Sequence, residues 1–135
     1  MSVEIGLKGR AEETVTDANT AQAACSGALP VYGTPFMTAL MEKAAWTSIA
    51  PRLAPGESTV GTAMNITHIS ASPVGIRVWA ESEVTLVDGK RIELKVAASD
   101  VGKVIGKQGR IAKAIRSVVK AASSKTEKKV VVEIQ

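Results

Sequence analysis

Residues 34–52 constrain the fold more than any other part of this 135-residue chain. Thr34-Pro35 is a typical helix start, because threonine can cap the first N–H groups and proline suits the first helical turn. Apolar residues then follow on almost every side of the expected helix: Phe36, Met37, Ala39, Leu40, Met41, Ala44, Ala45, Trp46 and Ile49. A helix that is apolar almost all round must be buried, so we expect a sheet to wrap around it.

Four segments have the composition of the strands that such a sheet needs. They are residues 3–16, 59–69, 76–87 and 91–97. Asp88-Gly89 separates the last two segments and is a strong signal for a two-residue hairpin turn. One buried helix after a first strand, followed by consecutive antiparallel strands, predicts an α+β fold with a sheet curled around a central helix.

Two motifs link this arrangement to a known family. The sequences GTPFMTALME (residues 33–42) and VGTAMNITHISASPVG (residues 60–75) resemble the fluoroacetyl-CoA thioesterase-like branch of the hot-dog proteins. The similarity covers about residues 1–98. It implies that Thr34, Glu42 and His68 act on the thioester carbonyl of an acyl-CoA at a dimer interface. A hydroxyl, a carboxylate and an imidazole can supply the nucleophile or oriented water, the base and the acid of such a reaction.

Each of these three residues also has a purely structural interpretation. Thr34 can serve only as the helix N-cap. Glu42 lies four residues after Thr38 on one helix face, which can simply face water. His68 alternates in register with Met64 and Ile66, as a hydrogen-bonded histidine on an apolar strand face does.

The C-terminal third contains a second motif, in which Gly106 and Gly109 bracket Lys107 and Gln108. A helix is expected to begin after Ser99-Asp100 and to end at this loop. A second helix is expected over residues 110–122. Its apolar stripe is formed by Ile111, Ala114, Ile115, Val118, Val119 and Ala122, and its cationic face by Lys113, Arg116 and Lys120. The structural interpretation of the loop is a glycine helix cap followed by a turn with solvated lysines.

The flanks of this loop resemble the small single-domain bacterial KH proteins, in the order strand, helix, GxxG loop, helix, strand, over residues 91–134. KH type II topology and the binding of single-stranded RNA are what this resemblance implies. The implied RNA-binding residues are Gly106, Lys107, Gln108 and Gly109 as the backbone clamp, with Arg110 and Lys113 as neighbouring contacts. The last strand of the KH pattern would be residues 130–134.

The charge distribution also favours a polyanionic partner for the C-terminal third. Residues 101–135 contain nine Lys and Arg against two Glu, whereas residues 1–100 contain eight Lys and Arg against eleven Asp and Glu. The net charge of +4 therefore combines a basic third with a slightly acidic remainder.

Neither resemblance is complete, because the final strand that closes a hot-dog sheet is expected after residue 97, where the KH pattern begins. The hairpin of residues 76–97 belongs to both patterns. We therefore predict one hybrid α+β domain over residues 1–135, with a hot-dog-like part (1–98) and a KH-like part (76–135). Such a splice suggests an engineered or recombined chimera that binds single-stranded RNA weakly. The alternative is an acyl-CoA thioesterase, for which the loss of the closing strand would leave the catalytic set vestigial.

Composition bounds the remaining functions. Cys25 is the only cysteine, so no internal disulfide can form, and one cysteine with one histidine predicts no metal site and no cofactor. No apolar run approaches ~18 residues and the N-terminus does not resemble a signal peptide. We therefore expect a cytoplasmic protein without a membrane partner. A homodimer is compatible with the hot-dog resemblance.

Overall fold

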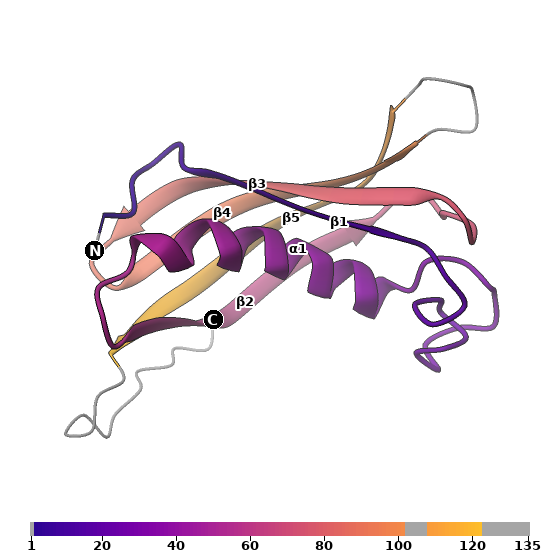
Figure 1. Cartoon of the computed structure of the whole chain (residues 1–135), viewed down its shortest axis with the longest axis horizontal. Helices are drawn as coiled ribbons and strands as arrows, with labels where there is room; N and C mark the ends of the chain where they lie inside the picture. Colours follow the sequence, from indigo (N-terminus) through magenta and orange to yellow (C-terminus); the bar gives the residue numbers. More distant parts are fainter. Residues whose placement is uncertain (1, 102–107, 123–135) are drawn as a thin grey trace.

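A five-stranded antiparallel sheet with one helix across its face forms the computed structural model, which describes residues 2–101 and 108–122 (Figure 1). The elements in chain order are β1 (Lys8–Thr14), α1 (Thr34–Ile49), a 3-10 turn (Ala50–Arg52), β2 (Glu57–His68), β3 (Arg77–Asp88), β4 (Arg91–Val101) and β5 (Gln108–Ala122). The strands are ordered β1-β3-β4-β5-β2, so β1 and β2 are the edges. The predicted α+β arrangement, a curled sheet around one helix, is confirmed.

The helix α1 is buried on the side that faces the sheet. Its buried residues are Met37, Leu40, Met41, Ala44, Ala45 and Ile49. They pack against inward side chains of the strands, of which Ile92 and Leu94 of β4 are fully buried. Gly9 lets α1 approach β1 closely, because a Cβ there would lie 2.3 Å from the Ala44 carbonyl oxygen. Trp46 remains 41% exposed, so the expected burial all round the helix holds only for its sheet-facing side.

The predicted hairpin between β3 and β4 forms, with its two-residue turn at Gly89 and Lys90, one residue later than the predicted Asp88-Gly89. Asp88 pairs with Arg91, and Gly89 takes a left-handed φ of 59° in the two-residue turn between them. β3 has the expected length but lies one residue later along the chain, whereas β4 is longer than expected and continues through Ser99 and Asp100 to its end at Val101. The expected helix start at Ser99-Asp100 is therefore wrong.

The largest correction concerns residues 110–122, which were expected to form a KH helix. They lie in β5, which pairs with β4 on one side and with β2 on the other. Ala112, Ala114, Arg116 and Val118 are buried at alternate positions, while Lys113 and Ile115 point outward. β5 thus provides the closing strand that the sequence interpretation considered lost.

A tertiary effect explains why the strand forms in place of the helix. Ala112, Ala114 and Val118 of this segment satisfy a period of two as well as a helical pattern, whereas Ile115 of the expected helical stripe is 59% exposed. Without β5, the inner edges of β2 and β4 would both present unpaired N–H and C=O groups. Pairing on both sides therefore overrides the helical pattern of the local sequence.

The remaining KH elements contribute no helix to the described residues. Gln108 and Gly109 pair with Val101 and Asp100 in the sheet. Gly106, Lys107 and the expected strand of residues 130–134 lie outside the described residues. Between residues 2 and 101 and from 108 to 122, no helix is long and apolar enough to cross a membrane.

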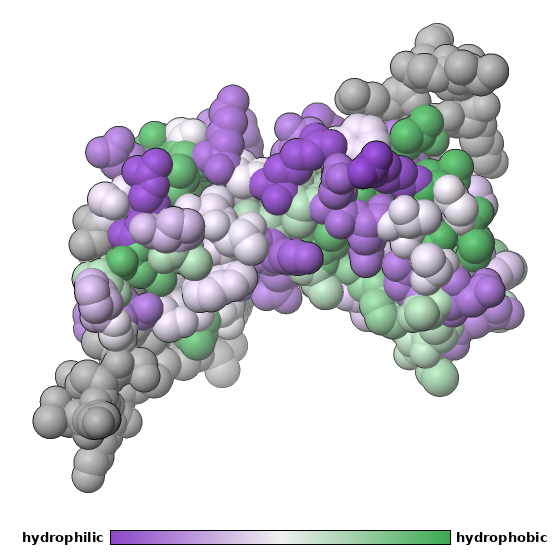
Figure 2. All heavy atoms as spheres, in the orientation of Figure 1, coloured by the Kyte–Doolittle hydropathy of each residue, from purple (hydrophilic) through white to green (hydrophobic). Residues whose placement is uncertain are grey.

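Surface hydrophobic residues are dispersed on the face seen in Figure 2. Hydrophilic side chains gather over β1 and β3 in that view, and the hydrophobic side chains form small separate groups. The exposed large hydrophobic residues are Ile5, Leu29, Trp46, Ile69, Val74, Val101 and Ile115. Single exposed apolar residues of this kind are normal for a protein in water.

Candidate functional site

Thr34 and His68 meet where the start of α1 lies beside the end of β2. The Thr34 Oγ1 atom lies 2.8 Å from His68 Nδ1. Gly33, and not Thr34, is the N-cap of α1, and no side chain caps this end of the helix. The Thr34 hydroxyl is thus free of the capping role that its sequence position suggested. It is also exposed, so a ligand can reach it.

Backbone hydrogen bonds on both sides hold this pair in place. The Gly33 N–H donates to the Asn19 carbonyl at 2.9 Å, and the Tyr32 N–H donates to the Ser72 carbonyl at 2.8 Å. On the other side, the Ile69 N–H donates to the Ile111 carbonyl of β5 at 2.7 Å. The segments that carry Thr34 and His68 are therefore anchored independently.

The buried Tyr32 adds a side-chain anchor at the start of α1. Its hydroxyl donates to a Glu13 carboxylate oxygen from β1, and it lies 3.4 Å from the Phe36 carbonyl. Burial raises the pKa of Tyr32, and the neighbouring Glu13 raises it further, so the phenol remains a protonated donor. This contact ties the first turn of α1 to the sheet.

The environment of His68 favours the neutral imidazole. Burial lowers its pKa below the ordinary value of 6.5, and the nearby Ser70 backbone offsets part of that effect. Its Nε2 atom is buried and has no hydrogen-bond partner among the described residues. A neutral imidazole beside a hydroxyl can accept that hydroxyl's proton.

Glu42 does not join Thr34 and His68 but binds Arg116 of β5. The Arg116 Nη1 atom donates to Glu42 Oε2. The Arg116 side chain is only 7% exposed, whereas that of Glu42 is 44% exposed. Sequence analysis missed Arg116 because it placed this residue on the solvated face of a helix.

Gly61 of β2 makes room for the Arg116 guanidinium. A Cβ at position 61 would lie 2.7 Å from Arg116 Nη2. An isolated glycine within a strand indicates close approach by another group, so Gly61 is the sequence signal that could have pointed to a buried neighbour. The Nε atom of Arg116 is buried without a partner in the described part of the chain.

The Thr34–His68 and Glu42–Arg116 pairs lie at two separate places beside α1. Glu42 follows Thr34 by eight residues of helix, which corresponds to about 12 Å along the axis. On the strands, His68 pairs with Ala112 and Met64 pairs with Arg116, a step of four residues or roughly 13 Å. One chain therefore brings together two of the three predicted catalytic residues and places the third two helical turns away.

The predicted RNA contacts Arg110 and Lys113 lie away from both of these pairs. Lys113 and Ile115 point away from α1, and Arg110 is exposed near the start of β5. In the described ranges, no cluster of three or more His, Cys, Asp or Glu could hold a metal ion.

Comparison with known proteins links most of the chain to one family. The family model described as FlK, fluoroacetyl-CoA-specific thioesterase, matches residues 15–122. The fluoroacetyl-CoA thioesterase of Streptantibioticus cattleyicolor is 42% identical over 76 residues, which are 56% of this chain and 55% of that protein. The chain thus spans little more than half the length of this relative in the alignment.

Solved structures show the same fold over most of the chain. The fluoroacetyl-CoA thioesterase FlK superposes with a TM-score of 0.78 and 26% identity, covering 90% of both chains. A Thermus thermophilus protein described as a thioesterase superfamily member superposes with a TM-score of 0.79 and 25% identity, covering 90% of this chain and 87% of that one.

A shorter similarity connects the chain to a different group of proteins. The RNA-binding protein KhpA of Clostridium acetobutylicum is 68% identical over 53 residues, which are 39% of this chain and 71% of that protein. KhpA of Clostridium perfringens is 77% identical over 43 residues, 32% of this chain and 57% of that protein. Because the thioesterase family model leaves only the first 14 and last 13 residues unmatched, these similarities overlap it.

Proposed function

We propose that this chain, which belongs to the family of fluoroacetyl-CoA-specific thioesterases, hydrolyses the thioester of a short acyl-CoA. The observation that carries the proposal is the 2.8 Å contact between Thr34 Oγ1 and His68 Nδ1. The relatives' substrates support the choice of an acyl-CoA, and β5 supplies the closing strand whose expected loss argued against activity.

In the proposed reaction, His68 acts as a general base on Thr34. Nδ1 accepts the hydroxyl proton while Oγ1 forms a bond to the thioester carbonyl carbon. The C–S bond then breaks, and the imidazolium returns its proton to the departing thiolate, giving free coenzyme A. Water, deprotonated by the same imidazole, hydrolyses the acyl-threonine and releases the carboxylic acid and the Thr34 hydroxyl.

Glu42 contributes from a second copy of the chain in this proposal. It lies about 12 Å along α1 from the Thr34 of its own chain, too far to act on the same carbonyl. The outer edge of β2 is unpaired in the described sheet, so two copies can join there. The Glu42–Arg116 pair of one copy would then lie near the Thr34–His68 pair of the other. Arg116 positions the Glu42 carboxylate through their ion pair.

A thiol-release assay with acetyl-CoA and fluoroacetyl-CoA tests the first part. The parent should turn over. His68→Ala should lose roughly 10²–10⁴-fold in rate, the usual contribution of an acid–base group, and Thr34→Ala should lose at least as much because it lacks the nucleophile. Thr47→Ala is the matched control, because its hydroxyl bonds only the α1 backbone. Equal rates for parent and His68→Ala would contradict the proposal.

Subunit mixing tests the position of Glu42. Thr34→Ala and Glu42→Gln chains should each be inactive alone. When they are refolded together in equal amounts, about a quarter of the parent rate should return, because half of the dimers are mixed and each mixed dimer holds one complete site. No recovery from a mixture shown to contain mixed dimers would place Glu42 in the site of its own chain.

Single-stranded RNA binding is the second candidate function, and it rests on the similarity to KhpA. If residues 106–109 clamp an RNA backbone, Lys107→Asp combined with Gln108→Asp should abolish binding, because two carboxylates would repel the phosphates. Fluorescence anisotropy at low salt measures this. Equal affinity of parent and double variant would remove the clamp from consideration.

A further inference from the structure

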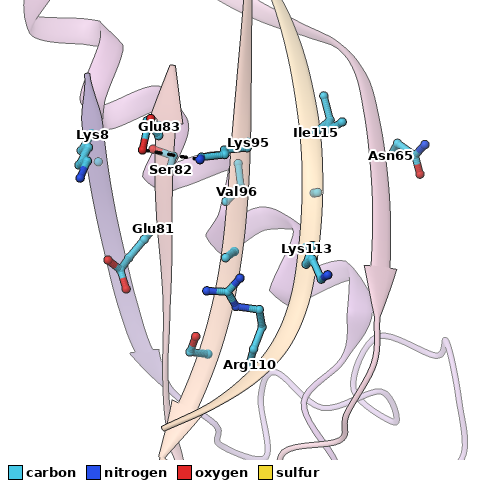
Figure 3. A pocket seen from close by; sticks show the side chains of 14 residues that line it. Lys8, Asn65, Glu81, Ser82, Glu83, Lys95, Val96, Arg110, Lys113 and Ile115 are labelled. Atoms are coloured by element: carbon cyan, nitrogen blue, oxygen red, sulfur yellow. Dashed lines mark ion pairs between the residues drawn. The ribbon is translucent and has the colours of Figure 1, made fainter. Parts of the chain in front are cut away.

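A groove of about 600 Å³ crosses the outer face of the sheet, opposite to α1 (Figure 3). Its floor forms where β4 carries the small residues Ala97 and Ser99. The neighbouring strands carry long side chains at the paired positions: Glu81 and Lys113 beside Ala97, and Arg110 beside Ser99. Small residues in the middle strand and long ones on both flanks thus produce a hollow on a sheet surface.

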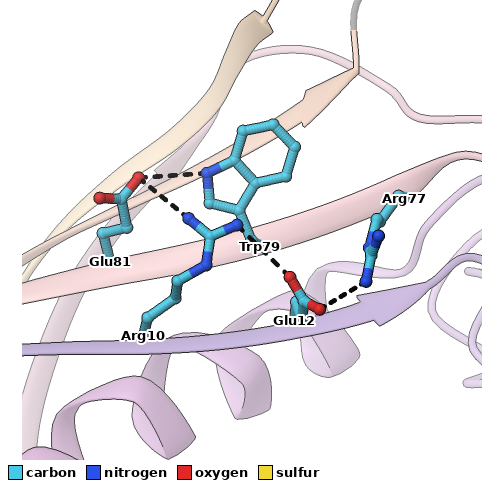
Figure 4. Close-up of polar contacts among 5 residues, drawn as sticks. All are labelled: Arg10, Glu12, Arg77, Trp79 and Glu81. Carbon is cyan, nitrogen blue, oxygen red and sulfur yellow. Dashed lines mark hydrogen bonds and ion pairs between the residues drawn. The ribbon is translucent and has the colours of Figure 1, made fainter.

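The acidic side chains of the groove are already partnered. Glu83 forms an ion pair with Lys95 at 3.9 Å. Glu81 accepts a hydrogen bond from Trp79 Nε1 at 3.1 Å and lies 3.8 Å from Arg10, whose guanidinium lies over the Trp79 ring (Figure 4). These contacts compensate the two carboxylates locally.

The cationic side chains of the groove are not all compensated. Lys8, Arg110 and Lys113 line it and form no ion pair with any described residue. Figure 3 shows the Arg110 guanidinium over β4, between Lys113 of β5 and Glu81 of β3. The groove therefore has a surplus of positive charge, with an arginine fork that suits a phosphate.

Next to these cations the groove is lined by an apolar side chain, Ile115, and an amide side chain, Asn65. Ile115 is 59% exposed, and it pairs across the ladder with Asn65 of β2. An exposed apolar side chain can cover the face of a planar ring, and an amide can hydrogen-bond to the ring's edge. The groove volume also lies within the usual range for small-molecule sites, roughly 300–1,000 Å³.

From this combination we infer that the outer groove binds a free nucleotide, with its phosphate on Arg110 and Lys113 and its base against Ile115 and Asn65. The site is distinct from the Thr34–His68 pair, because Asn65, Arg110, Lys113 and Ile115 lie on the sheet face opposite to α1. Arg110 and Lys113 thus recognise phosphate as part of a sheet surface and not as part of a helix.

Isothermal titration of the full chain with AMP tests this inference. Arg110→Gln combined with Lys113→Gln should weaken binding at least tenfold. Arg52→Gln combined with Lys90→Gln removes the same charge outside the groove and should leave the affinity unchanged. Ala97→Leu keeps every charge but fills the floor, and it should also weaken binding at least tenfold. Circular dichroism confirms that each variant is folded.

Three further ligands separate the alternatives. Adenosine, which lacks the phosphate, should bind at least tenfold more weakly than AMP, and equal binding would overturn the role of the cations. Inorganic phosphate binding as tightly as AMP would overturn the role of Ile115 and Asn65. Binding of a single-stranded RNA oligonucleotide without binding of AMP would overturn the free-nucleotide assignment in favour of a nucleic acid, and absence of all binding would overturn the site.

Discussion

The two faces of the sheet differ in whether their cationic side chains are paired. On the face toward α1, the buried Arg116 is held by Glu42, and Gly61 makes room for it. On the outer face, Arg110 and Lys113 of the same strand are exposed, with no ion pair to any described residue. A buried cation must be paired because its desolvation is costly, whereas an exposed cation is solvated by water. Cationic side chains of one strand can therefore form a buried ion pair on one face and remain free to bind an anion on the other.

Neighbouring residues of β4 should show the largest difference between the faces. Leu94 is fully buried against the core, whereas Lys95 points outward. Leu94→Ala should lower the free energy of unfolding by roughly 2–5 kcal/mol, because it leaves a cavity. Lys95→Ala should change it by less than about 0.5 kcal/mol. Urea unfolding followed by circular dichroism measures both, and similar losses would contradict the assignment of faces.

Glutamates on the two faces should differ next. Glu42→Ala leaves the buried Arg116 unpaired and should cost roughly 2–4 kcal/mol, below the full penalty for a buried pair because Glu42 is half exposed. Arg116→Met should cost less, since Glu42 can then be solvated. Glu81→Ala on the outer face removes an exposed ion pair and the hydrogen bond from Trp79 Nε1, so it should cost less than about 1 kcal/mol. If Glu42→Ala and Glu81→Ala have equal midpoints in urea, the Glu42–Arg116 pair makes no contribution to stability.

Gly61 tests the space that Arg116 occupies. Gly61→Ala should cost about 1 kcal/mol, because its Cβ would displace the guanidinium from Glu42. In the Arg116→Met background the same change should cost less, and a double-mutant cycle measures the difference. Additive effects would mean that Gly61 and Arg116 do not interact.

The pH dependence of thioester hydrolysis should reflect the environment of His68. The reaction requires the neutral imidazole, so kcat/KM should rise with pH through the pKa of His68 and then level off. Because burial lowers that pKa, the midpoint should fall below 6.5. A midpoint at or above 6.5 would place His68 in a more solvated or more acidic environment.

Most of the fold follows from local sequence signals, and one strand does not. The start of α1 at Thr34-Pro35 and the β3–β4 hairpin are both confirmed, because a proline in the first helical turn and a glycine in a tight turn act through their own backbone. The β5 segment was misjudged because Ala112, Ala114 and Val118 fit both a helix and a strand, and only pairing with β2 and β4 decides between them.

The candidate site was also predicted only in part. Family spacing selected Thr34 and His68, and the structure brings them together. It could not reveal that Glu42 contacts Arg116, because that contact exists only when β5 is a strand. The outer groove also depends on β5, so both proposed sites require residues 110–122 to form a strand and not a helix.

The backbone NMR chemical shifts of residues 110–118 in the full chain test that choice most directly. The strand β5 predicts Cα shifts below and Cβ shifts above the random-coil values along this segment, with cross-strand contacts from Ile115 to Lys95 and Asn65. A continuous run of helical shifts would contradict the account. It would separate Arg116 from Glu42, remove the outer groove and restore the KH interpretation.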